Sequence, residues 1–265
     1  MTSCYEGIRA SQTVETFEND VRSDEAHTII QQAFQPPGLV LDIGCGAGRY
    51  CYFLRSLGHT AVGMDLACRH LARFAGHMDR VHFLGGSGSA LPIASNSVDY
   101  VLIVGIVYEI LDATSREELF REIARVLKKP TGVCLYVDNM FPNVHIKTRA
   151  LLGRILKDTN KLVGIGPKMM AQSIVFSHRD IAAQFALAQM VVRSRWHCNV
   201  GYGVAHWTGL LRKRGIPTGS YKDYVDGGTT LNAMGRLIAS ALRRVAPVLG
   251  SKSCCYLATF EPSKE

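Results

Sequence analysis

A glycine-rich turn between an apolar run and an amphipathic segment is the feature that most constrains the fold of this chain. Residues 38–43 form a short apolar run, which is typical of a buried parallel strand. Gly44, Gly46 and Gly48 follow at alternate positions, and residues 50–57 carry apolar side chains at helical spacing. A strand, a glycine-rich turn and a helix make the first half of a nucleotide-binding βαβ unit, in which glycines let the main chain approach a ligand closely.

The glycine spacing and two acidic residues distinguish this turn from a dinucleotide site. The nicotinamide fingerprint is G-x-G-x-x-G, whereas here Gly48 comes one residue early and Arg49 stands in the place of the third glycine. Asp42 precedes the first glycine by two residues, and a second short strand over 61–65 ends in Asp65. Asp65 follows the glycines by about twenty residues, the distance at which a βαβ unit brings an acid to ribose hydroxyls.

The pattern D-x-G-x-G-x-G, with its second acid, resembles the class I S-adenosylmethionine (SAM)-dependent methyltransferases, the broad group that includes quinone and natural-product methyltransferases. The resemblance is specific over residues 38–138. It implies SAM as the cofactor and no metal site, with the turn and Asp42 holding the amino-acid part of SAM and Asp65 holding the ribose. The cofactor-binding residues that it implies are Asp42, Gly44, Cys45, Gly46, Gly48, Asp65, Leu66, Ser87, Gly88, Val104 and Gly105.

A second stretch, over residues 85–93, resembles the family's G-D-A-x-x-L-P-F segment, which wraps the adenine. When the two are aligned on Leu91-Pro92, Ser87 takes the usual Asp position. Gly88 takes that of the small residue whose amide faces the ring. A serine hydroxyl can accept a hydrogen bond from the adenine amine, but it does so without charge.

The residues expected near the transferable methyl group follow the fourth strand. Many relatives carry His-His there, and this chain carries Tyr108 and Glu109. A general base is needed only if the acceptor must lose a proton, and its candidates are Glu109, His145, His178, His197 and His206. We favour His145 because it follows the fifth strand closely and should lie at the carboxyl edge of the sheet, where ligands bind. The predicted catalytic residues are therefore His145, Glu109 and Tyr108.

Strand and helix patterns alternate through residues 38–138, which predicts an α/β fold with a doubly wound, Rossmann-like parallel sheet. We expect seven strands with helices on both faces, a helix that begins with a capping box at Ser115, and a helix capped by Ser177. The expected organisation is an N-terminal helical lid (1–37), a SAM-binding core (38–138), a basic cap insert (139–176), and a C-terminal part of the core (177–265) with a second cap insert at about 206–251.

Charge is distributed unevenly along the chain. Residues 1–137 hold 12 Lys and Arg against 15 Asp and Glu, whereas residues 138–265 hold 18 against 7. The basic half is either a solvated surface or a means of attracting an anionic substrate, nucleic acid or an acidic membrane. The chain lacks the D/N-P-P-Y/F and Pro-Cys motifs of nucleic-acid methyltransferases, which argues against nucleic acid. The amphipathic helix expected over 231–249 either packs on the core or touches a membrane surface.

We expect methyl transfer to the oxygen, nitrogen or carbon of a small molecule. The alternatives are a lipid or quinone acceptor at a membrane surface, and a SAM-binding partner subunit without transfer activity. Eight cysteines without a C-x-x-C pair, and the absence of a signal-peptide pattern, favour a cytoplasmic location. The sequence does not indicate an oligomeric state.

Overall fold

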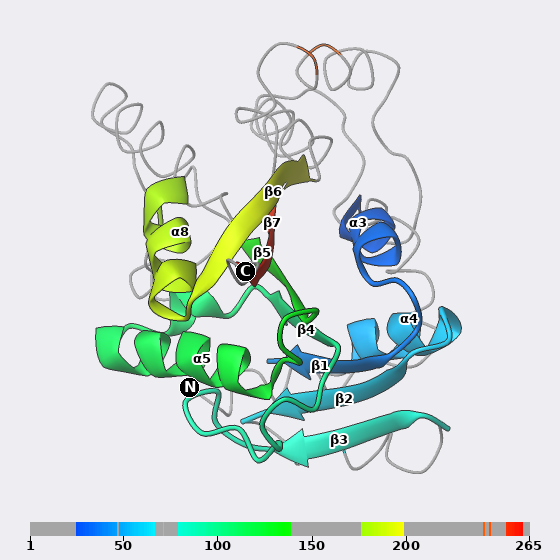
Figure 1. Ribbon diagram of the computed structural model, residues 1–265. Coiled ribbons are helices and arrows are strands. Elements are labelled where there is room, and N and C mark those ends of the chain that lie inside the picture. Colours follow the sequence, from blue (N-terminus) through cyan, green and yellow to red (C-terminus); the bar gives the residue numbers. More distant parts are fainter. Residues whose placement is uncertain are drawn as a thin grey trace, which may run out of the picture.

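A seven-stranded sheet in the order β3-β2-β1-β4-β5-β7-β6 organises the molecule (Figure 1). The computed structural model describes residues 25–46, 48–66, 71, 79–138, 176–198, 241, 244 and 253–261. The strands are β1 (Leu39–Ile43), β2 (Thr60–Asp65), β3 (Val81–Gly85), β4 (Tyr100–Val104), β5 (Val133–Asp138), β6 (Met190–Cys198) and β7 (Ser253–Phe260). Within the described residues the named helices are α3 (Glu25–Ala33), α4 (Arg49–Ser56), α5 (Ala113–Val126) and α8 (His178–Leu187), with a short 3-10 helix, η2 (Val107–Glu109). The predicted α/β class and seven-stranded sheet are confirmed.

The first five strands are parallel, as the sequence predicts for residues 38–138. From β1 the chain passes through α4 to β2 on one side, and β4 then pairs with β1 on the other side. The strand order therefore reverses between β1 and β4, and ligands of open α/β sheets bind outside the carboxyl ends of the strands at such a point. β7 departs from the parallel pattern, because it runs antiparallel between β5 and β6.

Helices cover both faces of the sheet (Figure 1). Alternate residues of a strand point to opposite faces. Leu41 accordingly belongs to the buried cluster that includes residues of α5 and α8, and its neighbour Val40 belongs to the cluster that includes residues of α3 and α4. Both side chains are fully buried, and burying a side chain of this size contributes about 1.5–3 kcal/mol. These two apolar layers hold the carboxyl ends of the strands in fixed positions.

Two helix starts test the capping predictions. The prediction for Ser115 is wrong, because α5 begins at Ala113 and its N-cap is Asp112. The Asp112 carboxylate accepts hydrogen bonds from the Ser115 N–H (2.7 Å) and hydroxyl (2.8 Å), so the capping unit starts three residues earlier than expected. The prediction for Ser177 is confirmed: it caps α8 and forms a capping box with Asp180.

Several expectations lie outside the described residues. They include residues 1–24 of the expected lid, most of both cap inserts, His145 and His206. The domain boundaries therefore remain predictions. Among the residues that are described, no helix has the length and apolar character needed to cross a bilayer.

Candidate functional site

The glycine-rich turn after β1 fits tightly between its neighbours. Gly44 and Gly48 have φ angles of 72° and 87°, in the left-handed region that favours glycine. A Cβ on Gly44 would collide with the Ile106 side chain, and a Cβ on Gly48 would lie 2.7 Å from Phe83 Cζ. The turn therefore touches residues that follow β4 and residues of β3, so it sits at the point where the strand order reverses.

Hydrogen bonds tie the same turn to the end of β2. The N–H groups of Gly44 and Cys45 donate to the Met64 carbonyl at 2.7 and 3.1 Å. The Gly46 N–H donates to Asp65 Oδ2 at 2.9 Å. The carboxylate that the sequence predicts to hold a ribose thus lies against the glycine turn, and a carboxylate can accept several hydrogen bonds at once. Leu66, the next predicted contact, is 72% exposed beside it.

Asp42 lies beneath the turn and not at the exposed edge. Its side chain is 1% exposed, and the Cys51 thiol donates to its Oδ2 at 3.5 Å. Burial raises the pKa of Asp42 to about 7, against the opposing effects of the Cys51 hydrogen bond and the Arg49 charge. Cys45 Sγ and Cys51 Sγ meet over Gly63, where an added Cβ would lie 2.9 and 2.8 Å from them. Asp42 therefore supports the turn from the α4 side.

The predicted adenine stretch begins beside Asp65. The Gly86 N–H donates to the Asp65 carbonyl at 3.3 Å. The exposed Ser87 hydroxyl lies 3.0 Å from the Ser89 hydroxyl and accepts from the Ser89 N–H at 3.3 Å. Gly88 packs against α5, since an added Cβ would lie 2.8 Å from Leu119 Cδ1. The structure thus brings this stretch, Asp65 and the glycine turn to one edge of the sheet.

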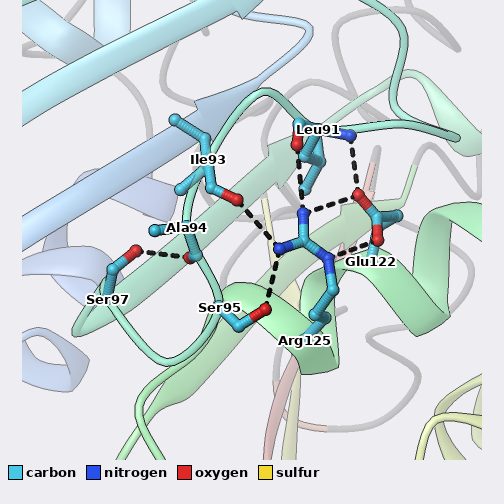
Figure 2. A network of polar contacts seen from close by, with 7 residues as sticks. All are labelled: Leu91, Ile93, Ala94, Ser95, Ser97, Glu122 and Arg125. Atoms are coloured by element: carbon cyan, nitrogen blue, oxygen red, sulfur yellow. Dashed lines mark hydrogen bonds and ion pairs between the residues drawn. The ribbon is translucent and has the colours of Figure 1, made fainter.

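A network of polar contacts joins the end of this stretch to α5, as Figure 2 shows. Glu122 Oε2 accepts from the Leu91 N–H at 2.7 Å. The Arg125 guanidinium donates to the carbonyls of Leu91 and Ile93 at 3.0 and 2.9 Å and to the Ser95 hydroxyl at 3.0 Å. Sequence reasoning missed both helix residues, because an acid and a base three positions apart on a helix are most often an ordinary surface pair.

The turn after β4 carries the residues predicted near the methyl group. Gly105 donates to the Val137 carbonyl at 3.0 Å, which fixes the start of the turn against β5. Val104 and Tyr108 are half-buried, and Glu109 is exposed in η2.

Arg116 fixes the far end of the same turn. Its guanidinium donates to the carbonyls of Ile110 and Leu111 at 2.6 and 2.8 Å. The same guanidinium lies 5.4 Å from the centre of the Phe176 ring. Arg116 is a further residue that the sequence patterns did not indicate, because its partners are main-chain carbonyls.

Two of the predicted base candidates lie together on the other half of the sheet. His178 Nδ1 and the Tyr256 hydroxyl are 2.6 Å apart, and the His178 and His197 rings are 5.9 Å apart. Burial lowers the pKa of both imidazoles, and the nearby Arg195 lowers it further. Tyr256 stacks on Tyr136 of β5 at 5.8 Å. His145, the base that the sequence favours, lies outside the described residues.

Comparison with known proteins points to the same part of the chain. Residues 40–131 match the family model described as a methyltransferase domain. A protein of Encephalitozoon cuniculi named as a methyltransferase is 37% identical over 101 residues, which cover 37% of this chain and 44% of that protein. This chain spans about half of the length, or less, of the curated relatives that it matches.

Solved structures show the same fold at low sequence identity. One is from the complex between the Haloferax volcanii Trm112 methyltransferase activator and a methyltransferase; it is 18% identical, with a TM-score of 0.57, and covers 97% of this chain and 98% of that one. Another is geranyl diphosphate C-methyltransferase from Streptomyces coelicolor, solved with Mg²⁺, geranyl diphosphate and S-adenosyl-L-homocysteine. It is 14% identical, with a TM-score of 0.55, and covers 89% of this chain and 78% of that one.

Proposed function

We propose that this chain, whose residues 40–131 match a methyltransferase domain, transfers a methyl group from SAM to a small-molecule acceptor. One observation carries the proposal. The Asp65 carboxylate lies 2.9 Å from the Gly46 amide of the glycine turn, at the point where the strand order reverses. An acid beside such a turn suits a ligand that presents ribose hydroxyls.

The proposal assigns each part of SAM to residues at this edge. The amino-acid part would lie over the glycine turn, Asp65 would accept hydrogen bonds from the ribose hydroxyls, and the stretch over residues 86–93 would face the adenine. SAM supplies a methyl group that is already activated on a sulfonium, so the work left to the chain is to hold and orient the acceptor and to exclude water. In this proposal the turn over Gly105 to Leu111, which Arg116 holds at its far end, does part of this work.

An acceptor that must lose a proton requires a base. We propose His178 as a base candidate in addition to His145, because burial lowers the pKa of His178 and keeps its imidazole neutral near pH 7. When the Nδ1–H donates to the Tyr256 hydroxyl, the Nε2 lone pair can accept the proton. Glu109 remains a third candidate, exposed in the turn after β4.

The small-molecule class rests on two features. The motifs of nucleic-acid methyltransferases are missing after β4, and the basic charge of residues 138–265 would attract an anionic acceptor. The Streptomyces structure named above shares the fold and is named for a small anionic substrate, geranyl diphosphate. A lipid or quinone at a membrane surface is the alternative within the same reaction.

A different role is a SAM-binding subunit that acts with a partner. It is favoured by Ser87 in the position of the family's acid and by Tyr108-Glu109 in place of His-His. The Haloferax methyltransferase in the complex with the activator Trm112 shares the fold, so a protein partner for this chain belongs to the same proposal.

Label transfer separates these roles. The purified chain is incubated with SAM labelled in its methyl group and with separate fractions of small metabolites, lipids, RNA and protein. Label in the metabolite fraction, lost in Asp65→Ala, supports the proposal. Label in the RNA or protein fraction would contradict the small-molecule class, and SAM binding without transfer to any fraction would favour the partner-subunit role.

A further inference from the structure

We propose that Glu122 and Arg125 of α5 are positioning residues that set how the stretch over residues 86–93 recognises adenine. The inference rests on the proposed function, because it needs an adenine-containing cofactor at this edge of the sheet. Neither side chain is assigned to bind the cofactor itself. They act through the main chain of the stretch, which they hold in one place.

Glu122 and Arg125 together form hydrogen bonds with both polar main-chain groups of Leu91. Glu122 Oε2 accepts from the Leu91 N–H at 2.7 Å, and Arg125 Nη2 donates to the Leu91 carbonyl at 3.0 Å. The two side chains also bind each other, with Arg125 Nη2 2.8 Å from Glu122 Oε2 and Nε 2.5 Å from Oε1. This two-point contact between guanidinium and carboxylate fixes the geometry of both groups, and it fixes Leu91 relative to α5 (Figure 2).

Further hydrogen bonds fix the stretch on both sides of Leu91. Arg125 Nη1 donates to the Ile93 carbonyl and to the Ser95 hydroxyl. At the other end of the stretch, the Gly86 N–H is held by the Asp65 carbonyl. The stretch is thus fixed by β2 at its start and by α5 at its end, and the residues between them, Ser87 to Ala90, form the part that can face a ligand.

The fixed main chain of residues 86–93 matters for adenine recognition because Ser87 carries no charge. The Ser87 hydroxyl is already in contact with Ser89, so selective contacts with the adenine amine depend on where the polar groups of the stretch stand. A displacement of about 1 Å is enough to lose a hydrogen bond. The ion pair is partly exposed, with 35% of the Arg125 side chain and 19% of the Glu122 side chain accessible, so we expect its removal to affect recognition more than folding.

Helix α5 offers a matched control. Arg121 and Glu117 form an ion pair of 2.8 Å between side chains that are 56% and 38% exposed, four positions apart on the same helix. Arg121→Ala removes the same kind of side chain and the same kind of ion pair from α5. It leaves the contacts of Leu91 and Ile93 in place.

The test compares two ligands by calorimetry: S-adenosylhomocysteine and S-inosylhomocysteine, in which a carbonyl replaces the adenine amine. We expect the wild-type chain to prefer the adenine ligand. We expect Arg125→Ala to weaken binding of that ligand about tenfold, the effect of one or two lost hydrogen bonds, and to bring the ratio of the two affinities towards one. Arg121→Ala should keep the wild-type affinity and ratio, and Arg125→Lys should restore part of both.

Several results would overturn the inference. One is a folded Arg125→Ala variant that keeps the wild-type ratio of the two affinities. Another is an equal loss of affinity for both ligands, which indicates a purely structural role. The third is a wild-type chain that does not discriminate between the ligands. If Arg125→Ala does not fold, Glu122→Gln, which keeps the shape and an acceptor for Leu91 but removes the ion pair, gives the same comparison. A wild-type chain that binds neither ligand contradicts the proposed function itself.

Discussion

The two halves of the carboxyl edge of the sheet are built in different ways. Over β1, β2 and β3 the candidate site consists mainly of main-chain groups, with the amides of Gly44 and Gly46 placed by neighbouring carbonyls and by Asp65. Over β5, β7 and β6 it consists of side chains, such as the hydrogen-bonded His178 and Tyr256. The first half suits a constant ligand, and the second half suits an acceptor that differs between proteins of the same fold.

The two halves also differ in how their ionisable groups respond to burial. Burial raises the pKa of Asp42 to about 7 in the first half and lowers the pKa of His178 and His197 in the second. In both cases the neutral form is favoured, because a low-dielectric surrounding penalises charge. The acid beneath the turn therefore takes up a proton more readily, and the bases beside β7 give one up more readily, than in water.

The largest expected effect concerns Asp42. The pKa of this acid in the folded state lies above its ordinary value of 3.8, so its stabilising contribution is complete below about pH 4 and is lost as pH rises through about 7. We expect the free energy of unfolding of the wild type to fall by up to about 4 kcal/mol over this range relative to Asp42→Asn. Urea denaturation at a series of pH values measures the difference, and parallel pH curves for the two proteins would contradict the burial of this carboxyl.

The second effect is a loss of ligand affinity when Asp65 is replaced. Asp65→Ala should weaken the affinity for S-adenosylhomocysteine on the order of 100-fold, because two hydrogen bonds from ribose hydroxyls to a charged acceptor are lost. Asp65→Asn keeps an acceptor for the Gly46 N–H and should lose less. Calorimetry gives both values. Unchanged affinity in Asp65→Ala would remove Asp65 from the site.

A third prediction tests how tightly the first half is packed. Gly48→Ala should destabilise the fold by about 2 kcal/mol, through its left-handed φ of 87° and the contact of the new methyl group with Phe83. Thermal or urea unfolding measures the loss. Adding Phe83→Leu should recover part of it, whereas strictly additive losses would mean that Phe83 does not confine the turn.

The smallest effect is expected in the second half. Tyr256→Phe removes the hydroxyl at 2.6 Å from His178 Nδ1, and it should cost about 1 kcal/mol of stability while the affinity for S-adenosylhomocysteine stays unchanged. Nitrogen NMR of the His178 ring should show a change of tautomer or pKa. A loss of cofactor affinity comparable to that of Asp65→Ala would end the distinction between the two halves.

The same contrast explains what the sequence could predict. The sequence predicts the strands of residues 38–138, the glycine turn and Asp65, because a main-chain site needs glycines and an acid at fixed spacing along one βαβ unit. It predicts the Ser177 cap for the same reason, since the partner Asp180 lies three residues away. The capping box assigned to Ser115 was wrong because Asp112, three residues earlier, offers a competing cap of the same chemistry.

The rest depends on contacts between distant residues. Tyr256 meets His178 across 78 positions, and it does so because β7 enters the sheet antiparallel between β5 and β6. Arg125 reaches Leu91 across 34 positions. No local pattern marks such pairs, because their side chains are of common types and only the fold brings them together.

Calorimetric titration of the wild-type chain with S-adenosylhomocysteine, with NADH as the control ligand, tests the central claim most directly. If the turn from Asp42 to Gly48 and the Asp65 carboxylate form a SAM site, the homocysteine ligand binds at one site with a Kd on the order of micromolar, a common range for enzyme ligands, and NADH does not compete. Binding of NADH in preference, or no binding of S-adenosylhomocysteine, would contradict the account.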